Sequence, residues 1–177
     1  MRFLRSWPET VPNGRAFVHD NVERLVMTGY DYRILEHVDD DVLLIEWDIA
    51  VDKEQLQTFA ARARSNPDRV LVAPYKLYHY SSDRDRPEPI WVHRRYEGTP
   101  ETGRLVHVTE DDPTCHLWGL GLVYLPRWIV RRFLDEWPGT LSDGAFSGWH
   151  YRNIEPEVPI AWDVRPVHLH YQIPAVF

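Results

Sequence analysis

The sequence predicts an α/β fold in which a mixed, mainly parallel sheet is flanked by helices. Continuous apolar runs at residues 42–45 and 70–73 are typical of strands that are buried on both faces. Segments with helical spacing of apolar residues alternate with these strand-like segments for much of the chain. The density of strand-like segments in the middle of the chain argues against a purely parallel sheet.

The first half of the chain contains residues that are typical of helix starts and helix ends. Apolar residues recur at roughly helical spacing before Gly29, and Asp52 is a typical N-cap residue. We expect, in order, a strand at 2–6, a helix over 15–27, a strand at 32–38, a strand at 42–45 and a helix from 53 to about 64.

The second half continues the alternation. Pro126 suits the first turn of a helix, and Pro138-Gly139 ends it. Two glycines precede the apolar run that leads to this helix. We expect strands at 70–73, 90–94 and 116–125, a helix over 127–137, a shorter helix over 144–151 and an alternating strand over 160–171.

Composition narrows the classes of protein. The chain has 177 residues, which fits one domain over residues 1–177. Its net charge of −7 argues against bulk nucleic acid as the main partner. Aromatic residues make up 13% of the chain and serve either as packing or as flat surfaces for sugars and bases.

Cellular location is predicted from cysteine content and apolar runs. Cys115 is the only cysteine, which excludes a disulfide within the chain and fits a reducing cytosol. The apolar runs are too short to span a bilayer, and the first residues lack the apolar segment of a signal peptide. We therefore expect a cytoplasmic protein without a membrane partner.

The strongest local motif is VLLIEWD at 42–48, a buried strand that ends in Glu46 and Asp48. Ligands bind beyond the carboxyl ends of strands in open α/β sheets. One or two carboxylates together with substrate phosphates commonly hold Mg²⁺ or Mn²⁺. The alternative is an acid pair that caps the turn before the next helix.

A second motif, VHLHY at 167–171, places His168 and His170 two residues apart on an expected strand. Both side chains then leave the same face, as metal ligands or as an ordinary surface pair. A separate acidic strand end and this histidine pair would suit the same ion.

The third motif is SDGAFSGWHYR at 142–152. Asp143 stands at a helix start, where it is either an N-cap or a positioned general base. Trp149 and Tyr151 could stack on a sugar ring or pack in the core.

Taken in this order, the three motifs resemble the GT-A family of nucleotide-sugar-dependent glycosyltransferases, over about residues 30–171. Glu46-Trp47-Asp48 matches the DXD motif that holds Mn²⁺ or Mg²⁺ on the donor diphosphate, with Glu in place of the first Asp. Residues 118–126 match the glycine-containing acceptor-side strand. Asp143 matches the base of inverting members, and His168 or His170 matches a metal-binding histidine near the C-terminus.

The resemblance implies a single GT-A-like (Rossmann-like) domain that transfers a sugar from a nucleoside-diphosphate sugar, with a UDP-sugar favoured. Asp143 would take the proton of the acceptor hydroxyl and invert the anomeric centre. The family's first βαβ unit is abbreviated here, and Pro8, Glu9, Thr10 and Asp39 are the expected nucleotide-binding positions. The acceptor stays open between a protein, a saccharide, a small molecule and a modified nucleobase.

Two other functions use part of the same pattern. A metal-dependent phosphoester hydrolase would employ the same carboxylates and histidines, but it usually needs further ligands in a dense cluster. A non-catalytic sugar- or nucleotide-binding module would explain the aromatic residues. It would not explain acids and histidines at separate strand ends.

Overall fold

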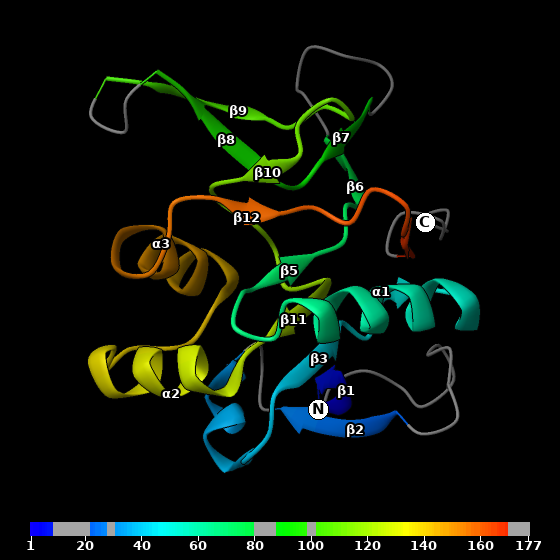
Figure 1. The fold of residues 1–177 in the computed structure, drawn as a ribbon, viewed down its shortest axis with the longest axis vertical. Helices are drawn as coiled ribbons and strands as arrows, with labels where there is room; N and C mark the ends of the chain where they lie inside the picture. Colours follow the sequence, from blue (N-terminus) through cyan, green and yellow to red (C-terminus); the bar gives the residue numbers. More distant parts are fainter. Residues whose placement is uncertain (9–21, 28–30, 80–87, 99–101, 170–177) are drawn as a thin grey trace, which may run out of the picture.

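The computed structural model describes residues 1–8, 22–27, 31–79, 88–98 and 102–169, which form a mixed α/β fold (Figure 1). Its main sheet has five strands. In spatial order these are β2 (Glu23–Met27), β1 (Arg2–Pro8), β3 (Val42–Ile45), β11 (Leu122–Leu125) and β5 (Leu71–Val72).

Strand direction changes in the middle of this sheet. β1 runs parallel to both β2 and β3, whereas β11 runs antiparallel to both β3 and β5. The expected mainly parallel sheet is therefore right only for β2, β1 and β3. Most strand pairings among the described residues are antiparallel, because β11 enters between β3 and β5 and the remaining strands form short ribbons.

In the described part of the chain, four two-stranded ribbons surround the main sheet, and each is antiparallel. In Figure 1 the β6–β7 and β8–β9 ribbons lie at the top, beyond β12. The pairs are β6 (Lys76–His79) with β7 (Glu88–Trp91), β8 (Arg94–Glu97) with β9 (Arg104–His107), β10 (Thr114–Cys115) with β12 (Val158–Pro159), and β4 (Ile49–Ala50) with β13 (Val167–His168).

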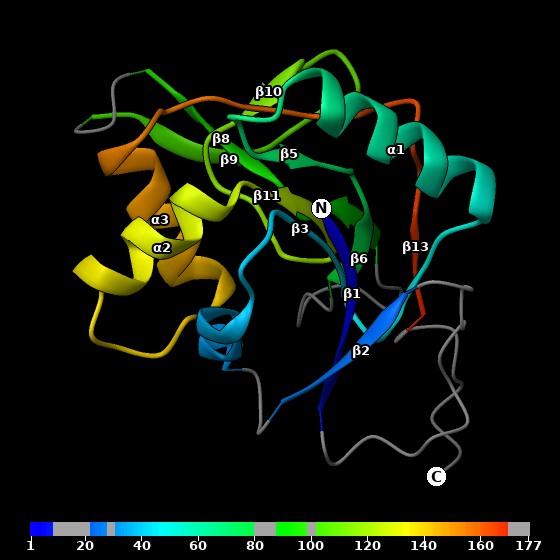
Figure 2. The same ribbon diagram turned by 60° about the horizontal axis from the view of Figure 1, so that its bottom comes forward.

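Helices cover the two faces of the sheet (Figure 2). α1 (Lys53–Ser65) packs with Leu43 and Ile45 of β3, whose side chains point to one face. α2 (Arg127–Glu136), α3 (Asp143–Asn153) and the 3₁₀ helix η1 (Tyr32–His37) pack on the other face with Val42 and Leu44. The alternation of side chains along a strand thus divides the core into two layers.

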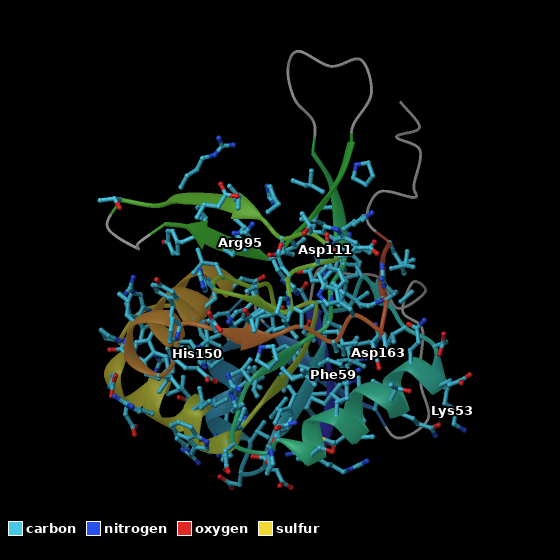
Figure 3. All side chains as sticks on the ribbon, turned by 45° about the horizontal axis from the view of Figure 1, so that its top comes forward. Lys53, Phe59, Arg95, Asp111, His150 and Asp163 are labelled. Carbon is cyan, nitrogen blue, oxygen red and sulfur yellow. The ribbon has the colours of Figure 1, made fainter. Side chains whose placement is uncertain are left out.

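Local signals predicted the central elements correctly. The Asp52 carboxylate accepts the Gln55 N–H at 2.8 Å and caps α1. The apolar face of α1 is buried, as Figure 3 shows for Phe59, whereas Lys53 is exposed. Strand β3 and helices α2 and α3 also lie where expected.

Several predicted elements were wrong in whole or in part. Of the expected strand at 116–125 only Leu122–Leu125 forms a strand, and the expected strand at 90–94 is divided between β7 and β8. Residues 23–27 form strand β2 because they pair with β1, and the rest of the expected helix up to residue 21 lies outside the described residues. The expected strand at 32–38 is η1, in which Tyr32 and Leu35 turn inward at a spacing of three. In the described part of the expected strand at 160–171, only Val167 and His168 form a strand, and residues 170 and 171 lie outside the described residues.

Within the described ranges, no helix combines the length and the apolar character that crossing a membrane requires.

Candidate functional site

The carboxyl end of β3 carries the two acids of the first motif. Backbone hydrogen bonding continues past the strand, because the Glu46 N–H donates to the carbonyl of Gly121 at 2.8 Å. The Ile49 N–H then donates to the carbonyl of Glu46 at 3.1 Å and closes a tight turn. Asp48 in this turn is buried, although it is a carboxylate.

Asp143 reaches the same place from the opposite end of the chain. It is the first residue of α3, and Ser142 is the N-cap, whose hydroxyl accepts the Ala145 N–H at 3.4 Å. The N-cap interpretation of Asp143 is therefore wrong. Its Oδ2 accepts the Leu120 N–H at 3.1 Å, one residue before the Gly121 that pairs with Glu46.

The β4–β13 ribbon places His168 beside Asp48. His168 lies opposite Ile49 in this ribbon, and the Leu169 N–H donates to the carbonyl of Asp48 at 2.7 Å. The imidazole Nε2 lies 3.2 Å from Oδ2 of Asp48, with both side chains about nine-tenths buried. Besides its contact with Asp48, the His168 ring stacks on the ring of Tyr75, with the two centroids 5.9 Å apart.

Glu46, Asp48 and Asp143, called the acid cluster below, influence one another electrostatically. Burial, followed by the charges of Asp143 and Asp48, raises the pKa of Glu46 to about 8, against a hydrogen bond that Tyr32 donates at 2.8 Å. Burial and then the charge of Asp48 raise the pKa of Asp143, while the Leu120 N–H opposes the shift. Glu46 is thus largely protonated at neutral pH.

Two tyrosines complete the walls of the site, and sequence reasoning missed both. Burial, followed by the charges of Glu46 and Asp143, raises the pKa values of Tyr32 and Tyr75, so both phenols stay neutral. Tyr75 fits here only because Gly119 and Gly121 lack side chains, since a Cβ on either would overlap its ring or hydroxyl. The Gly-x-Gly spacing before β11 was the signal for this close approach.

The expected nucleotide-binding positions do not all lie near the acid cluster. Asp39 lies before β3, at the opposite end of the strand from Glu46, and forms exposed ion pairs with Arg127 and Arg131. It is not part of this site, because it precedes the amino end of β3 whereas Glu46 follows the carboxyl end. Pro8 ends β1, which runs parallel to β3, so its backbone lies toward the edge of Glu46. Glu9 and Thr10 lie outside the described residues, as does His170.

The aromatic residues of the third motif pack within the protein. Trp149 is buried against Phe133 and Phe146 and donates its Nε1–H to Glu136 at 3.0 Å. Tyr151 lies against the rings of Tyr96 and His116. Trp149 therefore belongs to the core, and Tyr151 to a separate aromatic cluster.

The donor set of the acid cluster fits a hard divalent cation. Over the described ranges, no three His, Cys, Asp or Glu side chains are already arranged as a ligand set. However, the buried Oδ1 of Asp48 has no hydrogen-bond partner among these residues, and the neighbouring carboxylates repel one another. Carboxylate oxygens are the ligands that Mg²⁺ and Mn²⁺ prefer.

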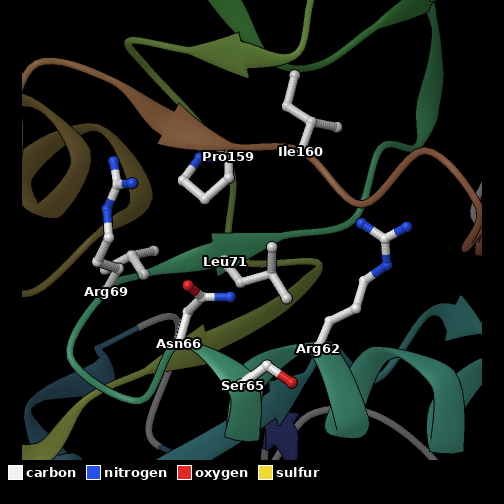
Figure 4. Close-up of a pocket in the computed structure, with 8 residues that line it drawn as sticks. Arg62, Ser65, Asn66, Arg69, Leu71, Pro159 and Ile160 are labelled. Carbon is white, nitrogen blue, oxygen red and sulfur yellow. The ribbon is translucent and has the colours of Figure 1, made fainter.

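A separate pocket of about 220 Å³ lies between the end of α1 and strand β5 (Figure 4). Leu71 and Ile160 form part of its lining, with Arg62 and Arg69 at its margins. Both arginines form ion pairs, with Asp163 and Glu155 respectively. No member of the acid cluster lines this pocket.

Comparisons with known proteins bear on the fold. No protein-family profile matches the chain, and no curated protein matches its sequence. The chain is similar to a solved structure described as the crystal structure of A197 from STIV, with a TM-score of 0.55 and 15% sequence identity. The alignment covers 95% of this chain and 85% of that chain. At this identity the likeness shows a shared fold alone.

Proposed function

We propose that this chain is a divalent-metal-dependent glycosyltransferase with a single GT-A-like (Rossmann-like) domain. It would transfer a sugar from a nucleoside-diphosphate sugar to an acceptor hydroxyl. The observation that carries the proposal is the convergence of Glu46, Asp48, Asp143 and His168 at the carboxyl end of β3, from three distant parts of the chain. Ligands of open α/β sheets bind at such strand ends.

Asp48 and Glu46 are the residues that would hold Mn²⁺ or Mg²⁺, and His168 or His170 would add a nitrogen. Asp48 offers a buried oxygen without a hydrogen-bond partner among the described residues. Glu46 would have to release its proton to bind the ion. When bound, such an ion neutralises the charge that develops on a departing diphosphate.

His168 and His170 have different parts in this proposal. His168 contacts Asp48 and stacks on Tyr75, so its ring is already oriented within the site. We propose that one histidine of the pair binds the ion and that the other orients its neighbour or contacts the diphosphate. His170, nearer the end of the expected strand, remains the favoured ligand.

Asp143 is the proposed general base for the acceptor hydroxyl. The Leu120 N–H fixes one of its carboxylate oxygens, and burial raises its pKa toward the range in which a carboxylate accepts a proton usefully. Attack from the side of Asp143 would invert the anomeric centre.

The donor and acceptor are proposed only as chemical classes. A UDP-sugar remains the favoured donor, with Pro8, Glu9 and Thr10 as the nucleotide contacts. The acceptor carries a hydroxyl and comes from a protein, a saccharide, a small molecule or a modified nucleobase.

The test is a thermal-shift panel of UDP, GDP, CMP and dTDP, each with and without Mn²⁺. A glycosyltransferase should be stabilised by one diphosphate only when Mn²⁺ is present. Turnover of a generic phosphodiester would instead identify a hydrolase. Stabilisation by a free glycan without metal would identify a binding module. The Asp48→Asn variant is the control, because it should lose the metal-linked shift.

A further inference from the structure

Arg5 is a buried cation that contacts the turn carrying the acid cluster. It lies on β1 directly opposite Ile45 of β3 and is only 4% exposed. Its Nη1 donates to the carbonyls of Glu46 at 3.1 Å and Ile49 at 3.0 Å. The carbonyl of Trp47 lies 3.5 Å from the same nitrogen. One side chain thus ties together the two ends of the turn at residues 46–49.

The other two guanidinium nitrogens of Arg5 lack hydrogen-bond acceptors among the described residues. Its Nε and Nη2 are buried and have no hydrogen-bond partner in the part of the chain that the structure describes. Burial lowers the pKa of Arg5 to about 10, and the charge of Asp48 acts in the opposite direction. Arg5 is therefore still a cation at neutral pH, although its surroundings disfavour the charge.

This combination argues against a role in global stability. Unsatisfied buried donors and buried charges destabilise a fold. Replacing buried charged groups by apolar side chains of similar volume is often neutral or stabilising. What Arg5 supplies locally is a fixed backbone for Glu46 and Asp48 and a positive charge beside Asp48.

We propose that Arg5 is a positioning residue, which fixes the turn at residues 46–49 so that Glu46 and Asp48 present their carboxylates to one cation. The cation rests on the proposed function, whereas the fixed turn does not. The two parts are therefore tested by separate measurements.

The first measurement is hydrogen exchange across residues 43–52, read by mass spectrometry. Arg5→Met should speed exchange of the Glu46 and Ile49 amides at least about tenfold, without lowering the denaturation midpoint. Arg5→Lys should fall between Arg5→Met and the unsubstituted protein, because an ammonium keeps the charge and some donors but loses the forked geometry. The control is Arg2→Met on the same strand, which removes an exposed pair with Glu23 and should leave exchange in this segment unchanged.

The second measurement is Mn²⁺ affinity by calorimetry, where Arg5→Met should weaken binding about 10- to 100-fold, as loss of a supporting residue does at metal sites.

Unchanged exchange in Arg5→Met would overturn the inference. A lower denaturation midpoint in both Arg5→Met and Arg5→Lys would also overturn the inference, because a purely structural role of Arg5 predicts that result. If Arg5→Met does not fold, Arg5→Lys decides. Faster exchange confined to 43–52 supports the inference, and faster exchange throughout the sheet contradicts it. If the unsubstituted protein binds no Mn²⁺, the proposed function fails while the exchange result still decides the role of Arg5.

Discussion

The two ends of strand β3 both carry acidic residues, but in opposite states. At the amino end, Asp41 accepts the Tyr124 hydroxyl at 3.0 Å and the Arg127 N–H at 2.8 Å. Asp39 there pairs with two arginines. At the carboxyl end, burial and the charges of neighbouring carboxylates raise the pKa values of two buried acids, and the buried cation beside Asp48, Arg5, donates to backbone carbonyls instead.

The difference teaches how to distinguish structural acids from functional ones. A carboxylate whose oxygens are all satisfied by the protein contributes to stability and has nothing left for a ligand. A buried carboxylate with an oxygen that has no partner among the described residues, such as Asp48, costs stability, which makes it a candidate for a role other than stabilising the fold. Perturbed carboxylates in a cluster are therefore candidates for function.

The largest effect that this comparison predicts is on turnover. Asp48→Asn should reduce glycosyl transfer by at least about 10³-fold, because the amide keeps the shape but removes charge from the proposed metal site. The matched variant Asp41→Asn, at the other end of β3, should keep kcat within about twofold. Steady-state kinetics with the nucleotide sugar identified in the thermal-shift panel measures both. Near-normal turnover of Asp48→Asn would abolish the distinction.

Asp143→Asn should lower kcat by about 10²- to 10⁴-fold, the usual contribution of a general base, with little change in donor affinity. The effect separates Asp143 from the metal-binding acids of the cluster. Donor binding measured by calorimetry alongside kcat provides the check. A variant that melts early but keeps its specific activity would show that Asp143 has only a structural role at the start of α3.

A smaller effect concerns the pH dependence of Mn²⁺ binding. The pKa of Glu46 is about 8, so below this pH a proton must leave before the ion binds. Affinity should rise about tenfold per pH unit between pH 6 and 7 and level off above pH 8. Calorimetry in two buffers of different ionisation enthalpy would also reveal the released proton. Affinity that does not change over this range would contradict a role for Glu46 as a ligand.

The smallest effect is on stability, and its sign should differ between the two ends of β3. The pKa of Glu46 is raised from 4.5 to about 8. Its contribution to the free energy of unfolding is therefore fully present below pH 4.5 and is lost as the pH rises through 8. Glu46→Gln cannot ionise, so at pH 9 it should be about 2–4 kcal/mol more stable than the unsubstituted protein. Asp41→Asn should instead be destabilised by about 1–3 kcal/mol. Urea denaturation at pH 5 and pH 9 distinguishes the two, and equal signs would refute the contrast.

Sequence reasoning succeeded where local signals are strong. The apolar run of β3, the Asp52 cap of α1 and the proline before α2 each predict their element without reference to the rest of the chain. Residues 23–27 were mistaken for helix because their pairing with β1 depends on residues distant in sequence. Tertiary pairing overrides local periodicity in such segments.

The candidate site shows the same limit. Glu46, Asp48, Asp143 and His168 could be proposed from sequence because their residue types and spacings suggest chemistry, and the structure brings these four together. Arg5 and Tyr75 could not be found in this way. An arginine in a short strand and a tyrosine after an apolar run look like ordinary residues. Only the contacts with the turn and with Gly119 and Gly121 connect them to the acid cluster.

The position of β11 in the sheet also sets the order in which the protein can fold. β3 and β5 are synthesised early, but the strand that lies between them is made much later. Until β11 emerges from the ribosome, neighbouring edges of both strands stay open, and such edges promote aggregation. Pairings between distant segments also slow folding. Because Asp143 and His168 follow β11 in the chain, the acid cluster and its contact with His168 are assembled only at the last stage, and a nascent chain that stops before residue 143 should lack the proposed metal site.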